Sequence, residues 1–343
     1  MRHTMQTAAE KTISTQDILA ASRTGSEASW RDYVHIARLD HMTKHVFIVP
    51  GIIMAYALVE PPLDGAVLAI ILGFASAILI ASANYIINEW LDREFDAFHP
   101  EKSKRTAVNK QLHAPVVYAS YAACATLGLL LAWWVGPIFA AVAIVFWLSG
   151  IVYNVKPFRS KDKSYFDVLS ESLNNPIRLM LGWTMIDQQS LAPLSLLVAY
   201  WMGGAFLMAA KRLSEYREIA ANAGVEVLHR YRRSFRFYTE RSLTLSCFLY
   251  AMLCTSLLAV FLIKYRIEYA LAFPLIVALF VHYLRLSLGS GSVAQKPEKL
   301  FRERRLMLLS SATTAALLSL TFIDVPMLES LTVPYLITID PAP

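Results

Sequence analysis

The chain has 343 residues, of which 56% are hydrophobic and only 17% carry a charge, and its mean hydropathy is +0.44. This composition is too apolar for an ordinary soluble domain and indicates a polytopic membrane protein. The formal net charge of +6 comes from loops between apolar segments, so phosphorylated substrates and anionic headgroups explain it better than nucleic acid does. The three cysteines lie within apolar segments and show neither a disulfide framework nor zinc-ligand spacing.

Long apolar stretches predict about nine membrane-spanning helices, because a lipid-exposed backbone must satisfy its own hydrogen bonds. The predicted fold class is therefore an all-α polytopic membrane protein. In chain order the predicted spans cover residues 46–60, 64–88, 114–133, 137–155, 165–187, 192–210, 243–263, 268–286 and 306–323.

The distribution of lysine and arginine over successive loops predicts how the chain is oriented. The loops after spans two, four, six and eight carry clusters of these residues, whereas those after spans one, three and five carry none. Because cytoplasmic loops hold an excess of Lys and Arg, we expect a multi-pass protein of the cytoplasmic (inner) membrane, with its N-terminus and charged loops in the cytoplasm. Residues 1–30 are expected to form a flexible cytoplasmic extension, residues 31–325 the transmembrane domain, and residues 326–343 a non-cytoplasmic tail.

The segment before the first span, residues 31–45, alternates apolar and basic positions at helical spacing and is predicted to be an interfacial helix. Lys44 stands at the entrance of the first span. His41 and His45 have the i, i+4 spacing of metal ligands. Since no carboxylate motif accompanies them, they are interpreted as interfacial histidines.

The end of the second span combines acidic, amide and basic side chains. Asn88, Asp92 and Asp96 recur every fourth residue, so on a helix they share one face. Lys102 and Arg105 follow shortly after. Carboxylates beside cations suit Mg²⁺ bound to a diphosphate, because the metal takes carboxylate and phosphate oxygens together while Lys and Arg bind the remaining phosphate charge. The competing interpretation is a solvated charge cluster that caps a membrane helix.

A second cationic loop, residues 153–164, contains Tyr153 and Lys161 and leads into span five. That span carries acidic, amide and basic side chains at three- and four-residue spacing, among them Glu171 and Arg178. Several charged groups in a membrane helix are costly unless they line a polar cavity or pair with each other. Because Glu171 and Arg178 are two helical turns apart, a shared polar chamber is favoured over an internal salt-bridge network.

Span six ends in a charged run that includes Lys211, Arg212 and Glu215. A Lys–Glu pair supporting an exposed helix end explains this run without a function, at roughly a few tenths of a kcal/mol. Because the run mirrors the position of the Asn88 motif, a functional role is favoured. Residues 222–241 are basic and aromatic and are predicted to form an interfacial lid or anchor rather than a nucleic-acid site.

These motifs resemble those of the UbiA-type intramembrane prenyltransferase superfamily, over residues 38–323. That superfamily's first Asp-rich motif, N-D-x-x-D-x-x-x-D, is matched by Asn88, Asp92 and Asp96, with Glu89 in place of its first aspartate. Within the superfamily the nearer resemblance is to the polyprenyl-phosphate (decaprenyl-phosphate) phosphoribosyltransferases. Residues that match their motifs are Arg38, Lys44, Pro50, Asp92, Asp96, His99, Pro100, Lys102, Arg105, Tyr153, Lys161, Arg178, Lys211, Arg212 and Glu215.

The resemblance implies nine transmembrane helices around a central polar cavity, with Mg²⁺ and a diphosphate bound at the ends of helices two and six. It further implies Mg²⁺-dependent transfer of a 5-phosphoribosyl group from phosphoribosyl diphosphate to a polyprenyl phosphate. The metal ligands would be Asn88, Asp92 and Asp96, and the catalytic residues Asp92, Asp96, Lys102 and Arg105. The substrate-binding residues would be Lys44, Asn88, Tyr153, Lys161, Arg178, Lys211, Arg212 and Glu215.

Two other functions stay open. Aromatic prenyltransferases usually carry a second D-x-x-x-D at the end of helix six, where this chain has Lys211 and Arg212, cations that suit a second phosphate group. The first alternative is that the protein transfers a prenyl group from a prenyl diphosphate to an aromatic or other small acceptor. The second is a membrane protein without enzymatic activity, such as a transporter or a lipid-binding module. Membrane lipids are expected partners in each case.

Overall fold

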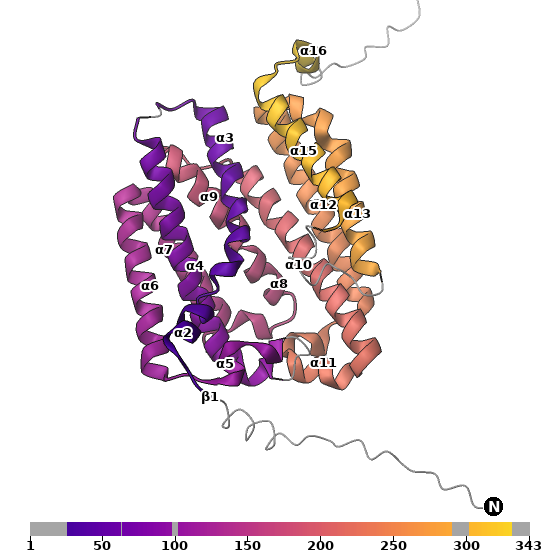
Figure 1. Cartoon of the computed structure of the whole chain (residues 1–343). Helices are drawn as coiled ribbons and strands as arrows, with labels where there is room; N and C mark the ends of the chain where they lie inside the picture. Colours follow the sequence, from indigo (N-terminus) through magenta and orange to yellow (C-terminus); the bar gives the residue numbers. More distant parts are fainter. Residues whose placement is uncertain (1–25, 63, 98–101, 290–301, 331–343) are drawn as a thin grey trace, which may run out of the picture.

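The computed structural model describes residues 26–62, 64–97, 102–289 and 302–330. Its long helices run side by side in one bundle (Figure 1). Three short helices, α2 (Trp30–Ile36), α5 (Thr106–Asn109) and α11 (Val225–Tyr231), lie together at one end of the bundle. We call this the charged end. Beside it, the two-residue strands β1 (Ser26–Glu27) and β2 (Lys110–Gln111) pair in parallel.

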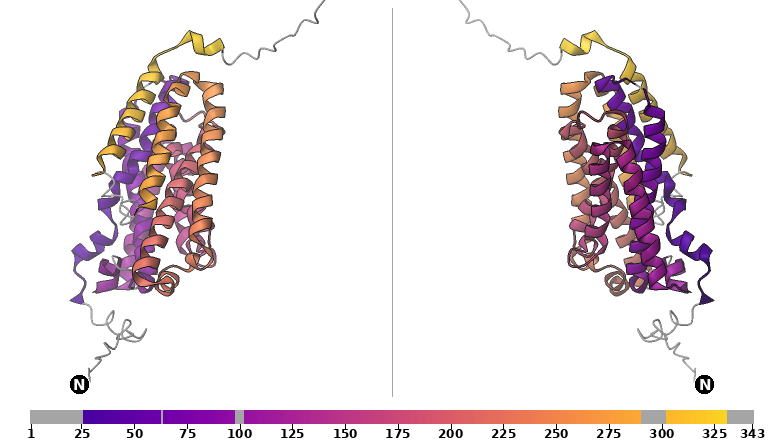
Figure 2. Two further views of the ribbon diagram at one scale, coloured as in Figure 1. Left: turned by 90° about the vertical axis from the view of Figure 1, so that its right-hand side faces the viewer. Right: turned by 90° about the vertical axis from the view of Figure 1, so that its left-hand side faces the viewer.

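The bundle follows the order of the predicted spans. Its helical elements are η1 (Leu39–Ile48), α3 (Val49–Val59), α4 (Ala66–Asp96), α6 (Ala114–Val135), α7 (Pro137–Asn154), α8 (Phe166–Ser172), α9 (Asn174–Ile186), α10 (Leu194–Ala223), α12 (Glu240–Tyr265), η5 (Ile267–Ala272), α13 (Phe273–Leu288) and α15 (Arg304–Phe322). A last short helix, α16 (Pro326–Glu329), follows α15. Both views of Figure 2 place α16 at the opposite end of the bundle from β1, as an odd number of crossings requires.

Seven of the helical segments in the described ranges are long and apolar enough to cross a membrane. A shorter apolar stretch, Thr43–Val59, corresponds to the first predicted span, and α8 with α9 corresponds to the fifth. The prediction of about nine helices is therefore confirmed. The fifth span is split because Pro176 has no N–H to donate to the carbonyl one turn earlier, which interrupts the helical hydrogen bonds between α8 and α9.

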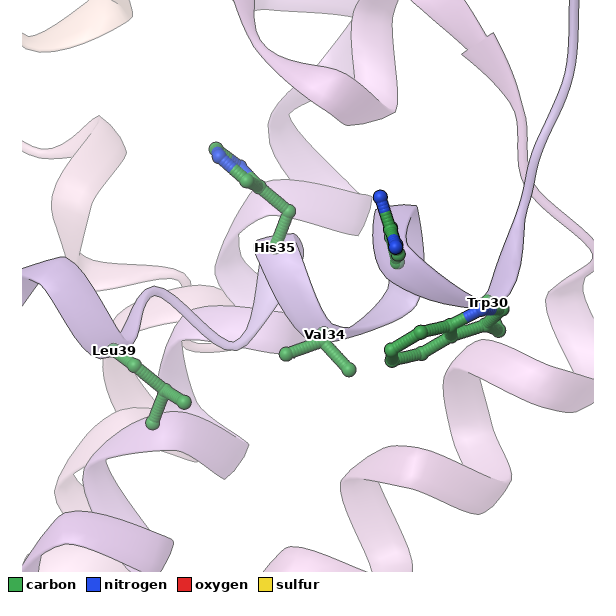
Figure 3. Close-up of a pocket in the computed structure, with 5 residues that line it drawn as sticks. Trp30, Val34, His35 and Leu39 are labelled. Carbon is green, nitrogen blue, oxygen red and sulfur yellow. The ribbon is translucent and has the colours of Figure 1, made fainter.

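The structure corrects the prediction for residues 31–45, which do not form one interfacial helix. Helix α2 stops at Ile36, Arg38 has a left-handed backbone conformation with φ of 53°, and the 3-10 helix η1 follows. The side chains of Trp30 and Val34 point to the same side of α2, and His35 points to the other (Figure 3). Trp30 is 71% exposed, so the interfacial position expected for this segment stays a prediction for α2 alone.

Two glycines allow α3 and α9 to cross in close contact. A Cβ at Gly51 would lie 2.0 Å from the carbonyl oxygen of Leu179, and a Cβ at Gly182 would lie 2.0 Å from that of Ile48. Both obstacles are backbone atoms, which cannot rotate away as a side chain can, so the crossing requires glycine on both helices. The crossing also sets η1 against α9, and each of these elements carries a predicted site residue.

The apolar packing is divided among clusters within the bundle. One buried cluster is centred on α10 and α12, and another joins α4, α7 and α9. Large apolar side chains also face outward, including Trp133, Trp134 and Phe248, which are 64% to 79% exposed. An apolar exterior around a bundle that buries many charged groups is the pattern of a protein whose sides contact lipid.

Candidate active site

The α4 end presents the predicted polar face. Helix α4 continues without interruption to Asp96, so Asn88, Asp92 and Asp96 lie at successive turns of one helix. The amide nitrogen Nδ2 of Asn88 lies 3.3 Å from Asp92 Oδ2 and 2.5 Å from the side-chain oxygen of Asn154 on α7. The side chain of Asp96 is buried. Glu89, in the place of the family's first aspartate, points elsewhere, since its Oε1 accepts a 3.3 Å hydrogen bond from the Ala107 N–H.

Each carboxylate of this face is paired with a cation from a neighbouring loop. Asp92 Oδ1 lies 2.6 Å from Lys161 Nζ and 2.8 Å from Arg159 Nη2. Asp96 Oδ2 lies 2.5 Å from Arg105 Nη1. Arg159 was not among the predicted site residues, although it lies in the cationic loop that the sequence singled out. The structure therefore brings Lys161 and Arg105 to the predicted face and adds Arg159.

Two lysines at this face have lowered pKa values. Burial lowers the pKa of Lys102, in the 3-10 turn η2 (Lys102–Lys104), to about 8, against the opposing effect of the carboxylates of Glu215 and Asp96. Burial likewise lowers the pKa of Lys161 to about 8, while its contact with Asp92 acts to raise it. The charge of Lys102 thus acts on the ends of both α4 and α10, so this loop lysine connects the two helix ends electrostatically.

The α10 end is built around one buried arginine. Arg212 Nε lies 3.1 Å from Asp167 Oδ2, Nη2 lies 2.6 Å from Glu171 Oε2, and Nη1 lies 3.1 Å from Glu215 Oε2. The Arg212 side chain is only 1% exposed. This corrects the polar chamber predicted for span five, because Asp167 and Glu171 instead belong to a buried ion-pair cluster. A phosphate would therefore compete with three carboxylates for Arg212, whose predicted substrate-binding role stays a prediction.

The same cluster holds the segment that follows α10. Asp167 accepts hydrogen bonds from Ser234 Oγ at 3.1 Å and from the Tyr238 hydroxyl at 2.7 Å, and Arg232 Nη2 lies 3.4 Å from its Oδ2. Arg232 also donates to the hydroxyl of Tyr153, at 3.1 Å. Tyr153, predicted to bind substrate, in turn donates to Glu171 at 3.0 Å. Helix α11 and the 3-10 helix η4 (Arg233–Phe237) are thereby fastened to α7 and α8.

Three further predicted cations, Lys44, Arg178 and Lys211, have no carboxylate partner within the described ranges. Lys44 Nζ lies 5.5 Å from the centre of the Tyr85 ring, and Arg178 Cζ lies 5.2 Å from that of Phe146. Arg178 is 7% exposed, and its buried Nε has no hydrogen-bond partner.

These three cations come from η1, α9 and α10, yet their charges act on shared neighbours. The charges of Lys44 and Arg178 both act on the His45 imidazole, and that of Lys44 also acts on Lys211. The carboxylates of Glu215 and Glu171 act on Lys211 without forming an ion pair with it, and an anion bound among the three cations would add further countercharge. We call Lys44, Arg178 and Lys211 the interior cations.

The donor set on α4 fits Mg²⁺ in one specific way. No group of three His, Cys, Asp or Glu side chains stands ready to hold a metal in the described parts of the chain. Mg²⁺, however, is usually bound by one or two carboxylates together with substrate phosphates rather than by a complete protein cage. Asp92 and Asp96, with the side-chain oxygen of Asn88, supply such a partial set. His99 and Pro100, which also match the family motif, lie outside the described residues.

The helical bundle thus carries buried ion pairs at the ends of both its second and its sixth span, α4 and α10. Residues 46–323 match the model of the UbiA prenyltransferase family, and the chain belongs to this family. The chain is thus a multi-pass membrane protein of UbiA type.

One curated relative carries a more specific name. The decaprenyl-phosphate phosphoribosyltransferase of Mycolicibacterium smegmatis is 28% identical over 164 residues, which are 47% of this chain and 48% of that protein. The match therefore spans about half the length of the relative.

Solved structures share the fold. A UbiA homologue from Archaeoglobus fulgidus bound to GPP and Mg²⁺ has a TM-score of 0.62 at 19% identity, covering 85% of this chain and 100% of the homologue. The same homologue bound to DMAPP and Mg²⁺ has a TM-score of 0.61 at 19% identity, covering 84% and 99%. A structure of digeranylgeranylglyceryl phosphate synthase has a TM-score of 0.55 at 14% identity, covering 88% and 96%. At these identities the similarity establishes the fold alone.

Proposed function

We propose that the protein transfers a 5-phosphoribosyl group from phosphoribosyl diphosphate to a polyprenyl phosphate. The observation that carries this proposal is the interior cations, none of which forms an ion pair within the described ranges and one of which, Arg178, has a buried Nε without a hydrogen-bond partner. The proposed reaction brings three phosphate-bearing groups together: the donor's diphosphate, its 5-phosphate and the phosphate of the acceptor. Transfer of a prenyl group to a neutral aromatic acceptor brings a single diphosphate, which leaves the interior cations without a ligand.

The α4 face would bind the diphosphate end of the donor. Asn88, Asp92 and Asp96 would hold Mg²⁺, which when bound neutralises charge on a diphosphate leaving group. Arg105 and Lys102 would stabilise the negative charge that moves to the diphosphate oxygen as its bond to the ribose carbon breaks. Donor groups already placed in a protein interior stabilise such charge without reorganisation, and one of them commonly contributes about 3–4 kcal/mol.

Lys161 and Arg159 would change partners when the donor binds. In the structure both cations hold Asp92, at 2.6 and 2.8 Å. Phosphate oxygens offer them an equivalent charged acceptor. Before the donor binds, these cations are balanced by Asp92, and after it binds they would be balanced by the phosphate oxygens.

The interior cations would bind the other phosphate groups. Lys44, Arg178 and Lys211 are the candidates for the acceptor phosphate and for the 5-phosphate of the donor. The acceptor phosphate oxygen would attack the ribose carbon as the diphosphate leaves, while the polyprenyl chain extends between helices into lipid. We place this site at the cytoplasmic face of the inner membrane, because the Lys- and Arg-rich loops lie there by the positive-inside rule.

Labelled donors separate this proposal from its main rival. Purified protein in detergent would be supplied with Mg²⁺, polyprenyl phosphate and radiolabelled phosphoribosyl diphosphate, and separately with a radiolabelled prenyl diphosphate and aromatic acceptors. The proposal expects label in the lipid fraction only in the first reaction. Label transferred only from the prenyl diphosphate would replace the proposal with prenyl transfer. No transfer from either donor would favour a non-enzymatic role.

A further inference from the structure

An open hollow of about 550 Å³ lies at the charged end, beside Arg159, the partner of Asp92. It is lined by residues from two separate loops, the loop after α7 and the η4 segment. The lining residues are Lys156, Pro157, Phe158, Arg159, Asp162, Lys163 and Arg233. We call it the basic hollow.

The basic hollow has an excess of positive charge. Lys156, Lys163 and Arg233 are exposed, and none of them forms an ion pair within the parts of the chain that the structure describes. Its single acidic side chain, Asp162, is already paired with Arg159, whose Nε lies 3.0 Å from Asp162 Oδ2. An anion in the hollow would therefore meet three uncompensated cations.

The hollow adjoins the α4 face through Arg159. This arginine lines the hollow and also reaches Asp92, at 2.8 Å from Nη2 to Oδ1. The guanidinium groups of Arg159 and Arg233 both lie against the ring of Phe95, with Cζ 5.2 and 5.5 Å from its centre. Phe95 belongs to α4, between the two carboxylates of the candidate metal site. One residue thus separates the hollow from the site.

Membrane orientation accounts for cations in the loop after α7, but it does not require them to meet Arg233 from a different loop. We propose that the basic hollow receives the phosphate groups of a water-soluble sugar phosphate donor before they reach Asp92. The inference rests on the proposed function, since a prenyl diphosphate would approach from the lipid instead. Clefts lined with one sign of charge raise the local concentration and the association rate of an oppositely charged substrate.

The test is a triple variant, Lys156→Ala, Lys163→Ala and Arg233→Ala, measured as the full-length protein in nanodiscs. We expect the KM for phosphoribosyl diphosphate to rise roughly 5- to 20-fold at low salt, with kcat within about twofold of the wild type. In about 0.5 M salt the difference in KM should nearly vanish, because salt screens interactions between exposed charges. Arg236→Ala is the matched control: Arg236 lies on the same 3-10 helix and is exposed, but it does not line the hollow.

The other source of phosphate is a lipid headgroup, since Phe158 at the rim is 59% exposed. The assays are therefore repeated in phosphatidylcholine discs with and without phosphatidylglycerol. A KM increase of the same size in both discs supports a soluble ligand, whereas a defect that appears only with the anionic lipid assigns the hollow to headgroups and overturns the inference. Wild-type turnover with an unchanged KM in the triple variant also overturns it, while the proposed function stands. A wild-type protein that does not consume phosphoribosyl diphosphate removes the proposed function and this receiving role together.

Discussion

The ends of α4 and α10 carry the same kinds of side chain in opposite arrangements. At the end of α4, two carboxylates, Asp92 and Asp96, each meet cations that come from loops. At the end of α10, one cation, Arg212, meets three carboxylates. Asp92 and Arg212 also differ in exposure, at 17% and 1% of their side chains, whereas Asp96 is 4% exposed.

Because of this difference, we expect Asp92 to be able to exchange its ion-pair partners and Arg212 not to be. A partly exposed carboxylate can release its cations to phosphate oxygens and take a metal ion, because water and ligand solvate every charge that is freed. A fully buried guanidinium has no such substitute, since each lost partner leaves an uncompensated charge in the interior. The α4 end is therefore suited to chemistry, and the α10 end to holding the bundle and the η4 segment together.

The largest expected effect is on turnover, from Asp92→Asn. We expect a loss of about 10³- to 10⁴-fold, or about 4–5.5 kcal/mol of activation free energy, because the proposed metal ligand loses its charge. The fold should persist, since Arg159 keeps Asp162 and Lys161 keeps its 2.8 Å contact with Asn154. Turnover and the thermal midpoint of the purified protein measure the two effects.

Glu94→Gln is the control for this substitution. Glu94 is a carboxylate on the same helix, but its side chain is 65% exposed and its contact with Arg93 is 3.9 Å long. It should leave turnover unchanged. If Asp92→Asn had the wild-type kcat, Asp92 would not be a metal ligand, and the proposed functional difference between the two helix ends would be wrong.

The next effect is on stability, from Arg212→Leu. Three carboxylates would lose their shared partner in the interior, and breaking a buried ion pair in this way costs about 3–5 kcal/mol. Unfolding in mixed micelles, followed by circular dichroism, gives the change in free energy. Arg217→Leu, farther along the same helix, removes an exposed pair with Glu240 and should cost less than about 1 kcal/mol. If Arg212→Leu lost as little free energy of unfolding as is expected for Arg217→Leu, the Arg212 cluster would not be structural.

Local patterns in the sequence were sufficient to predict which residues share the α4 face. The spacing of Asn88, Asp92 and Asp96 defines one face wherever the chain is helical, and the structure continues α4 through all three. The break in span five also had a local signal in Pro176, which a count of apolar residues does not detect. The end of α2 had none, because Arg38 takes its left-handed conformation without a glycine or proline nearby.

Partner choice could not be read from the sequence. The loop after α7 offers several cations, and only the tertiary fold decides that Arg159 and Lys161, rather than Lys156 or Lys163, reach Asp92. The same holds for Arg212, whose partners Asp167 and Glu171 lie on α8, far away in the chain. Spacing along a helix predicts which side chains share a face but not what the face meets.

A smaller effect is expected from substitution of Arg178. Like Arg212, this arginine is buried, but unlike Arg212 it forms no ion pair with a carboxylate within the described residues. Arg178→Met should raise the KM for the donor or the acceptor about 30- to 100-fold, since a phosphate would lose one charged partner. The thermal midpoint should not fall, because no ion pair is broken. Arg178→Lys keeps the charge and should recover part of the affinity. Steady-state kinetics with each substrate varied in turn give both constants.

Unchanged KM values for both substrates in Arg178→Met would contradict phosphate binding by the interior cations. A fall in stability equal to that of Arg212→Leu would mean that Arg178, too, has a structural role.

The most local effect is expected from Tyr238→Phe, which removes a hydroxyl that donates to Asp167 in the α10 cluster and accepts from the Tyr165 N–H. The hydroxyl donates to Asp167 at 2.7 Å, while Arg212 and Ser234 continue to hold that carboxylate. Loss of a hydrogen bond to a charged group costs about 1.5–3 kcal/mol. Because Tyr238 fastens the η4 segment, the loss should appear as faster hydrogen exchange in residues 225–238, with little change elsewhere. Tyr216→Phe, whose ring packs against Phe235 of the same segment, should leave that exchange unchanged. Uniformly faster exchange over the bundle would show that Asp167 supports the whole fold rather than this segment.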